Sequence, residues 1–135
     1  MIALDTNVLV RALTRDDPAQ TPAAQHLLGH AGGVFISKTV LLELEWVLRA
    51  AYRQPPAAIH QALLRLLSLP HVAAEQPEHL AQALNDFAAG MDFADALHLA
   101  AAQAAGLPFH TFDTACAKAA RRLGRQAVPV KPKKH

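Results

Sequence analysis

Short apolar runs alternate along this chain with longer segments in which apolar residues recur at every third or fourth position. The short runs are typical of buried strands, and the longer spacing is typical of helices that bury one face. Strands that alternate with helices predict a three-layer α/β/α fold with a mainly parallel sheet. The expected strands lie at 2–4, 34–36, 72–73, 107–112 and 127–130.

Capping residue types mark the starts of several helices between these strands. Thr6-Asn7 precede the first helical spacing, and Thr21-Pro22 combine a capping hydroxyl with a proline at the first helical position. Ser37 is expected to cap the helix that follows the second strand. Asp113 is expected to cap a helix over 114–123.

The chain has 135 residues, of which 52% are hydrophobic and 18% are charged. This composition fits one globular domain that needs no disulfide to fold. The one cysteine, Cys116, is expected to be a small buried side chain, and no Cys/His pair has zinc-finger spacing. Because Asp5 interrupts the apolar start and no long apolar run follows, we expect no signal peptide, no membrane span and a cytoplasmic location.

Positive charge gathers near the end of the sequence, although the formal net charge is only +2. A basic end of this kind could hold a phosphate backbone, or it could be a solvated tail. We therefore divide the chain into a domain over 1–130 and a basic tail over 131–135. The basic residues are Arg121, Arg122, Arg125, Lys131, Lys133 and Lys134.

Acidic residues stand at or near the carboxyl ends of the expected strands. Asp5 follows the first strand and Asp113 follows the fourth, while Glu43 and Asp95 lie on helices. In open α/β sheets, ligands bind beyond the carboxyl ends of the strands, where the strand order reverses. If strands one and four are neighbours there, Asp5 and Asp113 face one crevice and repel each other unless a cation lies between them.

Carboxylates without His or Cys partners favour Mg²⁺ or Mn²⁺ over zinc. Such a site can hydrolyse a phosphodiester, because the metal polarises a phosphoryl oxygen and lowers the pKa of a bound water. Asp5 and Asp95 are expected to be the main metal ligands. Asp113 is expected to bind a second or weaker ion, and Glu43 to bind metal or to orient the water.

Each acid also has a purely structural interpretation. Asp113 alone would be a helix cap, Asp95 would favour a helix dipole, and Glu43 would be an exposed helix residue. Asp5 is harder to dismiss, because a carboxylate that closes a buried strand needs a partner. Taken together, the four structural interpretations are less plausible than any one of them alone.

The acidic segments resemble the PIN domain, and in particular the VapC toxins of bacterial toxin–antitoxin pairs. They occur in the order of that family and span most of the chain. The matching segments are Leu4–Val10, Asp16–Gln20, Leu42–Leu44, Asp92–Leu97 and Thr111–Asp113.

The resemblance implies a five-stranded parallel sheet in the order 3-2-1-4-5 and a nuclease domain over 1–130. It implies endonucleolytic cleavage of RNA with Mg²⁺ or Mn²⁺ at Asp5, Glu43, Asp95 and Asp113. Thr6, Asn7 and Thr111 match polar positions that support such a site, and Asp92 is an additional acid one turn from Asp95. A homodimer and a cognate antitoxin are the implied protein partners.

Other residues leave their roles open. Arg11 and Arg15 could meet phosphate or an antitoxin, or be plain surface residues. Trp46 and Tyr52 are expected in packing or dimer contacts. His98 could approach the site, although a partly buried, hydrogen-bonded ring is the simpler expectation.

Two other functions fit the same pattern less well. A phosphatase on a doubly wound sheet also places an aspartate after the first strand, but the haloacid-dehalogenase group requires a second aspartate where this chain has Asn7. A PIN-like scaffold could bind RNA or a protein without cutting, although intact acids argue against it. Stabilisation by Mn²⁺ would separate a metal site from a scaffold.

Overall fold

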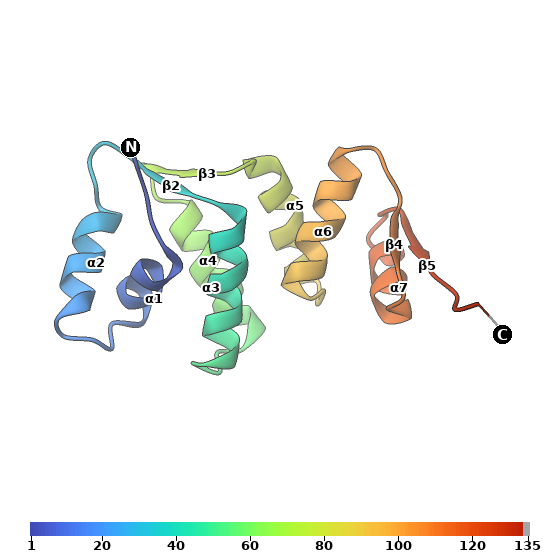
Figure 1. Ribbon diagram of the computed structural model, residues 1–135, viewed down its shortest axis with the longest axis horizontal. Helices are drawn as coiled ribbons and strands as arrows, with labels where there is room; N and C mark the ends of the chain where they lie inside the picture. The colour runs from blue at the N-terminus through green and yellow to red at the C-terminus, as the bar shows by residue number, and fades with distance from the viewer. Residues whose placement is uncertain (134–135) are drawn as a thin grey trace. The chain divides into compact units, whose positions relative to one another are not determined.

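Residues 1–133 are described by the structure, a computed structural model, and they fall into two units of continuous chain (Figure 1). The first unit is Met1–Pro77 and the second is Glu78–His135. Lys134, part of the predicted basic tail, lies outside the described residues, and the boundary of that tail stays a prediction.

The first unit is a parallel three-stranded sheet with helices. Residue Ile2 pairs with Val34, and Val34 pairs with Val72, so the order is β1-β2-β3. Both Val34 and Ile36 are fully buried, which explains why this short run has a continuous apolar character. The strands are β1 (Ile2–Ala3), β2 (Val34–Ile36) and β3 (Val72–Ala74). The helices are α1 (Thr6–Thr14), α2 (Gln20–Leu28), α3 (Lys38–Ala50) and α4 (Pro56–Leu67).

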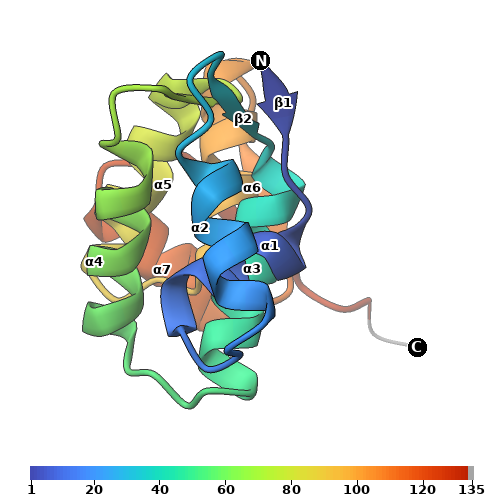
Figure 2. The ribbon, with the colours of Figure 1, turned by 90° about the vertical axis from the view of Figure 1, so that its left-hand side faces the viewer.

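Helix α1 packs against both α2 and α3, and α3 packs against α4 (Figure 2). The buried faces of these helices carry leucine and isoleucine at helical spacing, as the periodicity predicts. The fully buried members include Leu9, Leu41, Leu44, Leu48, Ile59 and Leu63.

The second unit has a two-stranded parallel sheet, in which Phe109 pairs with Ala127 and Thr111 pairs with Pro129. Within it, the rings of Phe87 and Phe93 meet edge to face, with centroids 5.3 Å apart. Their contact joins α5 to α6. The elements are α5 (Pro77–Ala88), α6 (Phe93–Ala104), β4 (Phe109–Thr111), α7 (Thr114–Arg122) and β5 (Ala127–Pro129).

A buried ion pair fixes the loop between α7 and β5 to α5. The Asp86 side chain is completely buried, and it accepts hydrogen bonds from Arg125 Nη2 at 3.0 Å and Nε at 3.3 Å. A guanidinium that binds both oxygens of a buried carboxylate satisfies its hydrogen-bonding needs. Arg125 therefore has a structural role. It is not one of the basic residues that could bind a ligand.

The strands and helices predicted from the sequence are all present, within a few residues of their expected ends. The α/β class is therefore confirmed, and so are the parallel orders 3-2-1 and 4-5. The strands form two separate sheets in the described residues, so the junction of strands one and four in the order 3-2-1-4-5 stays a prediction.

Two helix starts differ from the prediction. Asp5, not Thr6-Asn7, caps α1, because its Oδ1 accepts a hydrogen bond from the Thr6 N–H at 2.7 Å. Asp17 accepts hydrogen bonds from the first N–H groups of α2, at Ala19 and Gln20, and Thr21 lies inside the helix. The Thr21 hydroxyl instead donates to the Arg11 carbonyl, because it faces α1 and is buried.

No helix over residues 1–133 is long and apolar enough to cross a membrane.

Candidate active site

Asp5 and Glu43, the two predicted site acids of the first unit, line one pocket. Asp5 lies just beyond β1, and Glu43 lies on α3, which packs against α1. The pocket has a volume of about 290 Å³ and is lined by Asp5, Thr6, Asn7, Val10, Glu43 and Val47. Two of the four predicted site acids therefore line one pocket, together with Thr6 and Asn7, which the resemblance gives as supporting positions.

Thr6, which helps to line this pocket, carries a buried and unsatisfied polar atom. Its side chain is buried, and its hydroxyl oxygen has no hydrogen-bond partner within the described part of the protein. A buried polar group left without a partner costs about 1–3 kcal/mol. The unpaired hydroxyl is therefore a local cost of folding next to the pocket.

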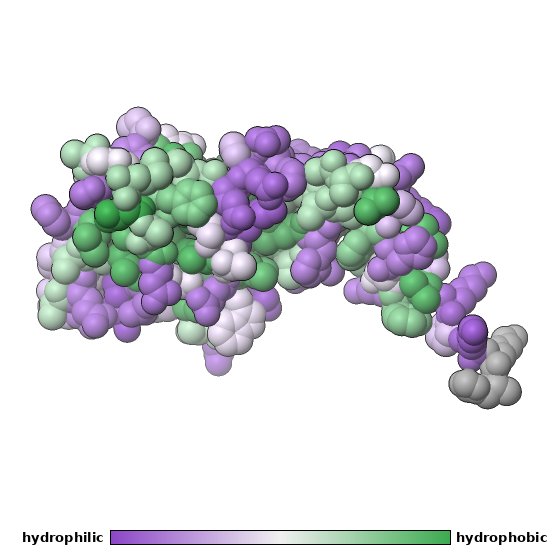
Figure 3. Space-filling model, turned by 45° about the horizontal axis from the view of Figure 1, so that its top comes forward, coloured by the Kyte–Doolittle hydropathy of each residue, from purple (hydrophilic) through white to green (hydrophobic). Residues whose placement is uncertain are grey.

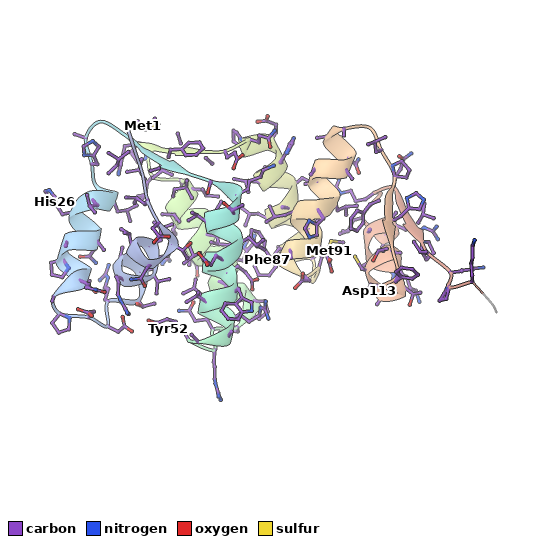
Figure 4. All side chains as sticks on the ribbon, in the orientation of Figure 1. Met1, His26, Tyr52, Phe87, Met91 and Asp113 are labelled. Carbon is purple, nitrogen blue, oxygen red and sulfur yellow. The ribbon has the colours of Figure 1, made fainter. Side chains whose placement is uncertain are left out.

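Three acids of the second unit lie at the starts of its helices. Asp92 caps α6 by accepting from the Asp95 N–H at 3.1 Å, and Asp113 caps α7 by accepting from the Cys116 N–H at 2.9 Å. The Thr111 hydroxyl accepts from the Asp113 N–H at 3.0 Å. Asp113 therefore stands where β4 ends and α7 begins (Figure 4), and Thr111, which the resemblance gives as a supporting position, contacts it.

The Asp95 carboxylate is the one most affected by its neighbours. Its pKa is raised above the usual value, first by partial burial and then by the charge of Asp92, with a further contribution from Asp113. Hydrogen bonding to Cys116 acts in the opposite direction. The three acids are thus close enough to repel one another, and a cation would relieve that repulsion.

Cys116 is buried, as predicted, but its contact with Asp95 was not predicted. Burial raises the pKa of its thiol to about 11, and the charges of Asp95 and Asp113 add to this effect. The only sequence signal was its position three residues after Asp113, where a capping aspartate accepts a backbone hydrogen bond. The protonated thiol helps to position the Asp95 carboxylate.

Native Cys116 is expected to resist alkylation at neutral pH. The shift of its pKa from 9.0 to about 11 reduces the thiolate fraction about 100-fold, and the thiolate is the reacting form. Iodoacetamide labelling followed by mass spectrometry should show slow reaction in buffer and rapid reaction in guanidinium chloride. Equal rates in the two conditions would contradict the burial of this thiol.

The donor set matches a hard divalent cation in chemistry, because it consists of carboxylates and hydroxyls. Within residues 1–133, however, no three His, Cys, Asp or Glu side chains are placed to hold a metal together. The structure thus brings Asp5 to Glu43, and Asp95 to Asp92 and Asp113, each group within its own unit. Convergence of all four predicted acids stays a prediction.

Arg11 is not a plain surface residue, because it belongs to a network of polar side chains. Its guanidinium donates to Gln20 at 2.8 Å, to Asp16 at 3.3 Å and to the Tyr52 hydroxyl at 3.4 Å. The Tyr52 hydroxyl in turn donates to Asp16 at 2.7 Å. The network links α1, the loop before α2 and the residues just after α3.

Tyr52→Phe is expected to lower stability at neutral pH and to have less effect in acid. The hydrogen bond from Tyr52 is the first cause of the lowered pKa of Asp16, followed by that from Thr14. Because the pKa of Asp16 is lower in the folded protein, its hydrogen bond from Tyr52 stabilises the fold fully above the unfolded-state pKa of about 3.9. This stabilisation is lost as the pH falls through the pKa of Asp16 in the folded protein. Urea unfolding at neutral pH and at about pH 3 measures the difference, and an equal loss at both would contradict it.

Two aromatic expectations were wrong in part. Trp46 is 56% exposed, so it does not pack in the core of its unit, and a dimer contact stays a prediction. His98 is exposed, not partly buried, and stacks on Phe109 with ring centroids 6.4 Å apart. Its position in α6, one turn after Asp95, leaves it a small favourable charge interaction with that acid.

Comparison with known proteins gives a family match over most of the chain. The PIN domain family matches residues 2–122. The crystal structure of Mycobacterium tuberculosis VapC20, described as a sarcin-ricin loop cleaving toxin, is 23% identical and has a TM-score of 0.45. The match covers 98% of this chain and 100% of that one, a similarity too weak to support an inference about function. A search of curated proteins found no match.

Proposed function

This chain belongs to the PIN-domain family, and on that premise we propose that it is an endoribonuclease that hydrolyses RNA with Mg²⁺ or Mn²⁺. The observation that carries the proposal is the pocket shared by Asp5 and Glu43, with Thr6 and Asn7 in its lining. Oxygen donors without His or Cys partners are the set that these ions prefer.

In this proposal Asp5, Asp95 and Asp113 hold the metal, and Glu43 orients the attacking water. A bound divalent ion supplies a polarised phosphoryl oxygen and a water of lowered pKa. Thr6 N–H fixes the Asp5 carboxylate at 2.7 Å, which leaves its other lone pairs for a ligand. The Cys116 thiol, the Thr111 hydroxyl and the helix caps hold the other carboxylates in place.

The proposal requires all four acids to serve one phosphate. This requires strands one and four to be neighbours in a single parallel sheet, as the resemblance implies. Asp5 and Asp113 then follow adjacent strands. The mutual repulsion of the acids in the second unit supports a role for a cation on that side.

We also propose that the protein is the toxin of a toxin–antitoxin pair, acting as a homodimer in the cytoplasm. This part rests on the sequence segments that resemble VapC toxins. Co-purification with the product of a neighbouring gene, and loss of cleavage in that complex, are the expected results. A neighbouring protein that binds without reducing cleavage would contradict the toxin role.

The ribonuclease proposal is tested by incubating the full chain with total RNA and Mn²⁺ or Mg²⁺, followed by sequencing of the new ends. We expect discrete internal cuts, abolished by EDTA and by Asp5→Asn. The amide keeps the helix cap, since asparagine caps as well as aspartate, but it removes the charge. Glu78→Gln, an exposed acid in the first turn of α5, is the matched control and should cut normally. Cleavage that persists in EDTA or in Asp5→Asn would overturn the proposal.

A further inference from the structure

The fold separates basic residues that are neighbours in the sequence. Helix α7 returns from the end of β4 to the start of β5, so Arg121 and Arg122 lie at the end of α7 near the start of β5. There the Arg121 Nε donates to the Ala127 carbonyl at 2.9 Å. Arg125 is committed to the buried Asp86. The cluster seen in the sequence is therefore not one surface.

Lys131 and Lys133 come after the carboxyl end of β5, at the other end of this sheet from Arg121 and Arg122. Strands β4 and β5 run parallel in the register Thr111 to Pro129, and the Val130 N–H donates to the Thr111 carbonyl at 2.7 Å. Lys131, the next residue, thus leaves the sheet where Phe112 and Asp113 leave it (Figures 1 and 4). Both lysines are exposed, and the described part of the tail is hydrophilic in Figure 3.

Phe112 stands between the end of β4 and the proposed metal ligand Asp113, and 70% of its surface is exposed. A single exposed phenylalanine is unremarkable by itself. Here the ring is at the same sheet edge as a carboxylate that would serve phosphodiester hydrolysis and two exposed cations. An aromatic face beside positive charge is how proteins hold unpaired nucleotides, with bases stacked on the ring and phosphates near the lysines.

We propose that Phe112, Lys131 and Lys133 form a binding subsite for single-stranded RNA, with a base stacked on Phe112 and phosphates contacted by the lysines. The inference rests on the proposed ribonuclease function and names the form of its substrate. Exposed lysines at this end of the sheet supply positive charge, which attracts a phosphate backbone. A paired helix fits the subsite less well, because its bases are not free to stack on a side chain.

The test is binding in EDTA, where no cleavage occurs, of a short fluorescein-labelled RNA of mixed sequence without self-complementarity. Fluorescence anisotropy gives the Kd at several salt concentrations for the full-length protein and its variants. We expect Phe112→Ala to weaken binding about tenfold, Phe112→Leu to do the same, and Phe112→Tyr to bind like the parent, because tyrosine keeps the ring. The same RNA annealed to its complement should bind several-fold more weakly.

The lysines are tested by salt dependence. Each phosphate contact on a single strand contributes a slope of about −0.7 to log K against log salt, so Lys131→Ala/Lys133→Ala should flatten the slope by about 1.4. Arg122→Ala, which removes an exposed charge from the other end of α7, should leave the slope unchanged. Thermal unfolding confirms that each variant is folded.

The subsite is overturned if Phe112→Ala binds the single strand as the parent does, if the duplex binds equally well, or if Arg122→Ala flattens the slope as much as the lysine variant. Addition of Mn²⁺ to the same samples separates this result from the proposed function. A protein that binds the strand through Phe112 but never cuts it contradicts only the ribonuclease proposal. If the protein cuts RNA but Phe112→Ala leaves the Kd for the single strand unchanged, only the subsite proposal is contradicted.

Discussion

Arg125→Ala is expected to destabilise the protein by about 3–5 kcal/mol, because it leaves the completely buried Asp86 carboxylate without its cation. Since native domains have a total stability of about 5–15 kcal/mol, this loss is a large share of the whole. Urea unfolding followed by circular dichroism measures it. The effect should be accompanied by early exposure of the second unit to proteases.

The double variant Asp86→Leu/Arg125→Leu distinguishes a lost ion pair from lost packing. Replacing both partners by apolar side chains removes the buried charge together with its partner, so stability should return close to that of the parent or exceed it. Arg125→Lys keeps the charge but loses the two-pronged geometry, and should be intermediate. A cost below about 1 kcal/mol for Arg125→Ala would show that the pair is not desolvated as the structure has it.

Asp95→Asn is expected to reduce RNA cleavage by about 100-fold or more, given that loss of a residue that only supports a metal ligand already costs about 10–100-fold. The same change should leave the metal-free protein as stable as the parent or more so, because it removes a charge that Asp92 and Asp113 repel. The two effects have opposite signs, which a misfolded variant could not produce.

The measurements are initial cleavage rates and melting temperatures with and without Mn²⁺. Parent protein at a Mn²⁺ concentration of about 100 times Kd should gain about 2.7 kcal/mol, and Asp95→Asn should gain much less. Glu78→Gln should match the parent in both assays. Full cleavage by Asp95→Asn, or an undiminished response to Mn²⁺, would remove Asp95 from the proposed ligand set.

The sequence predicted most of the fold because the signals were local. Alternation of apolar runs and helical spacing located the strands, and Ser37 and Asp113 cap α3 and α7 as their residue types indicated. The helix starts at Thr6 and Thr21 were misplaced by one to a few residues, because aspartates just upstream compete for the same N–H groups. Local patterns do not decide which of two adjacent capping residues is used.

The candidate site was predictable in residue types and only partly in geometry. The sequence indicated Asp5, Glu43, Asp95 and Asp113 as the acids of one site, and of these Asp5 and Glu43 line one pocket. The predicted meeting of Asp5 with Asp113 stays a prediction. Nothing in the sequence indicated that the Thr6 hydroxyl would be buried without a partner, or that the Cys116 thiol would contact Asp95. These facts depend on tertiary packing, which sets the depth and direction of a side chain. Arg125 and Lys131 are likewise separated by β5, which lies between them in the chain.

Each of the two units is one uninterrupted stretch of chain, so the first unit can fold before the second has been synthesised. Domains generally fold as units, beginning with the amino-terminal part. All three strands of the first sheet, and both acids of its pocket, precede Glu78, so that part can acquire its pairings while the rest is still untranslated. If hydrolysis needs Asp95 and Asp113 as proposed, a nascent chain cannot cut the message that encodes it until both residues have been translated.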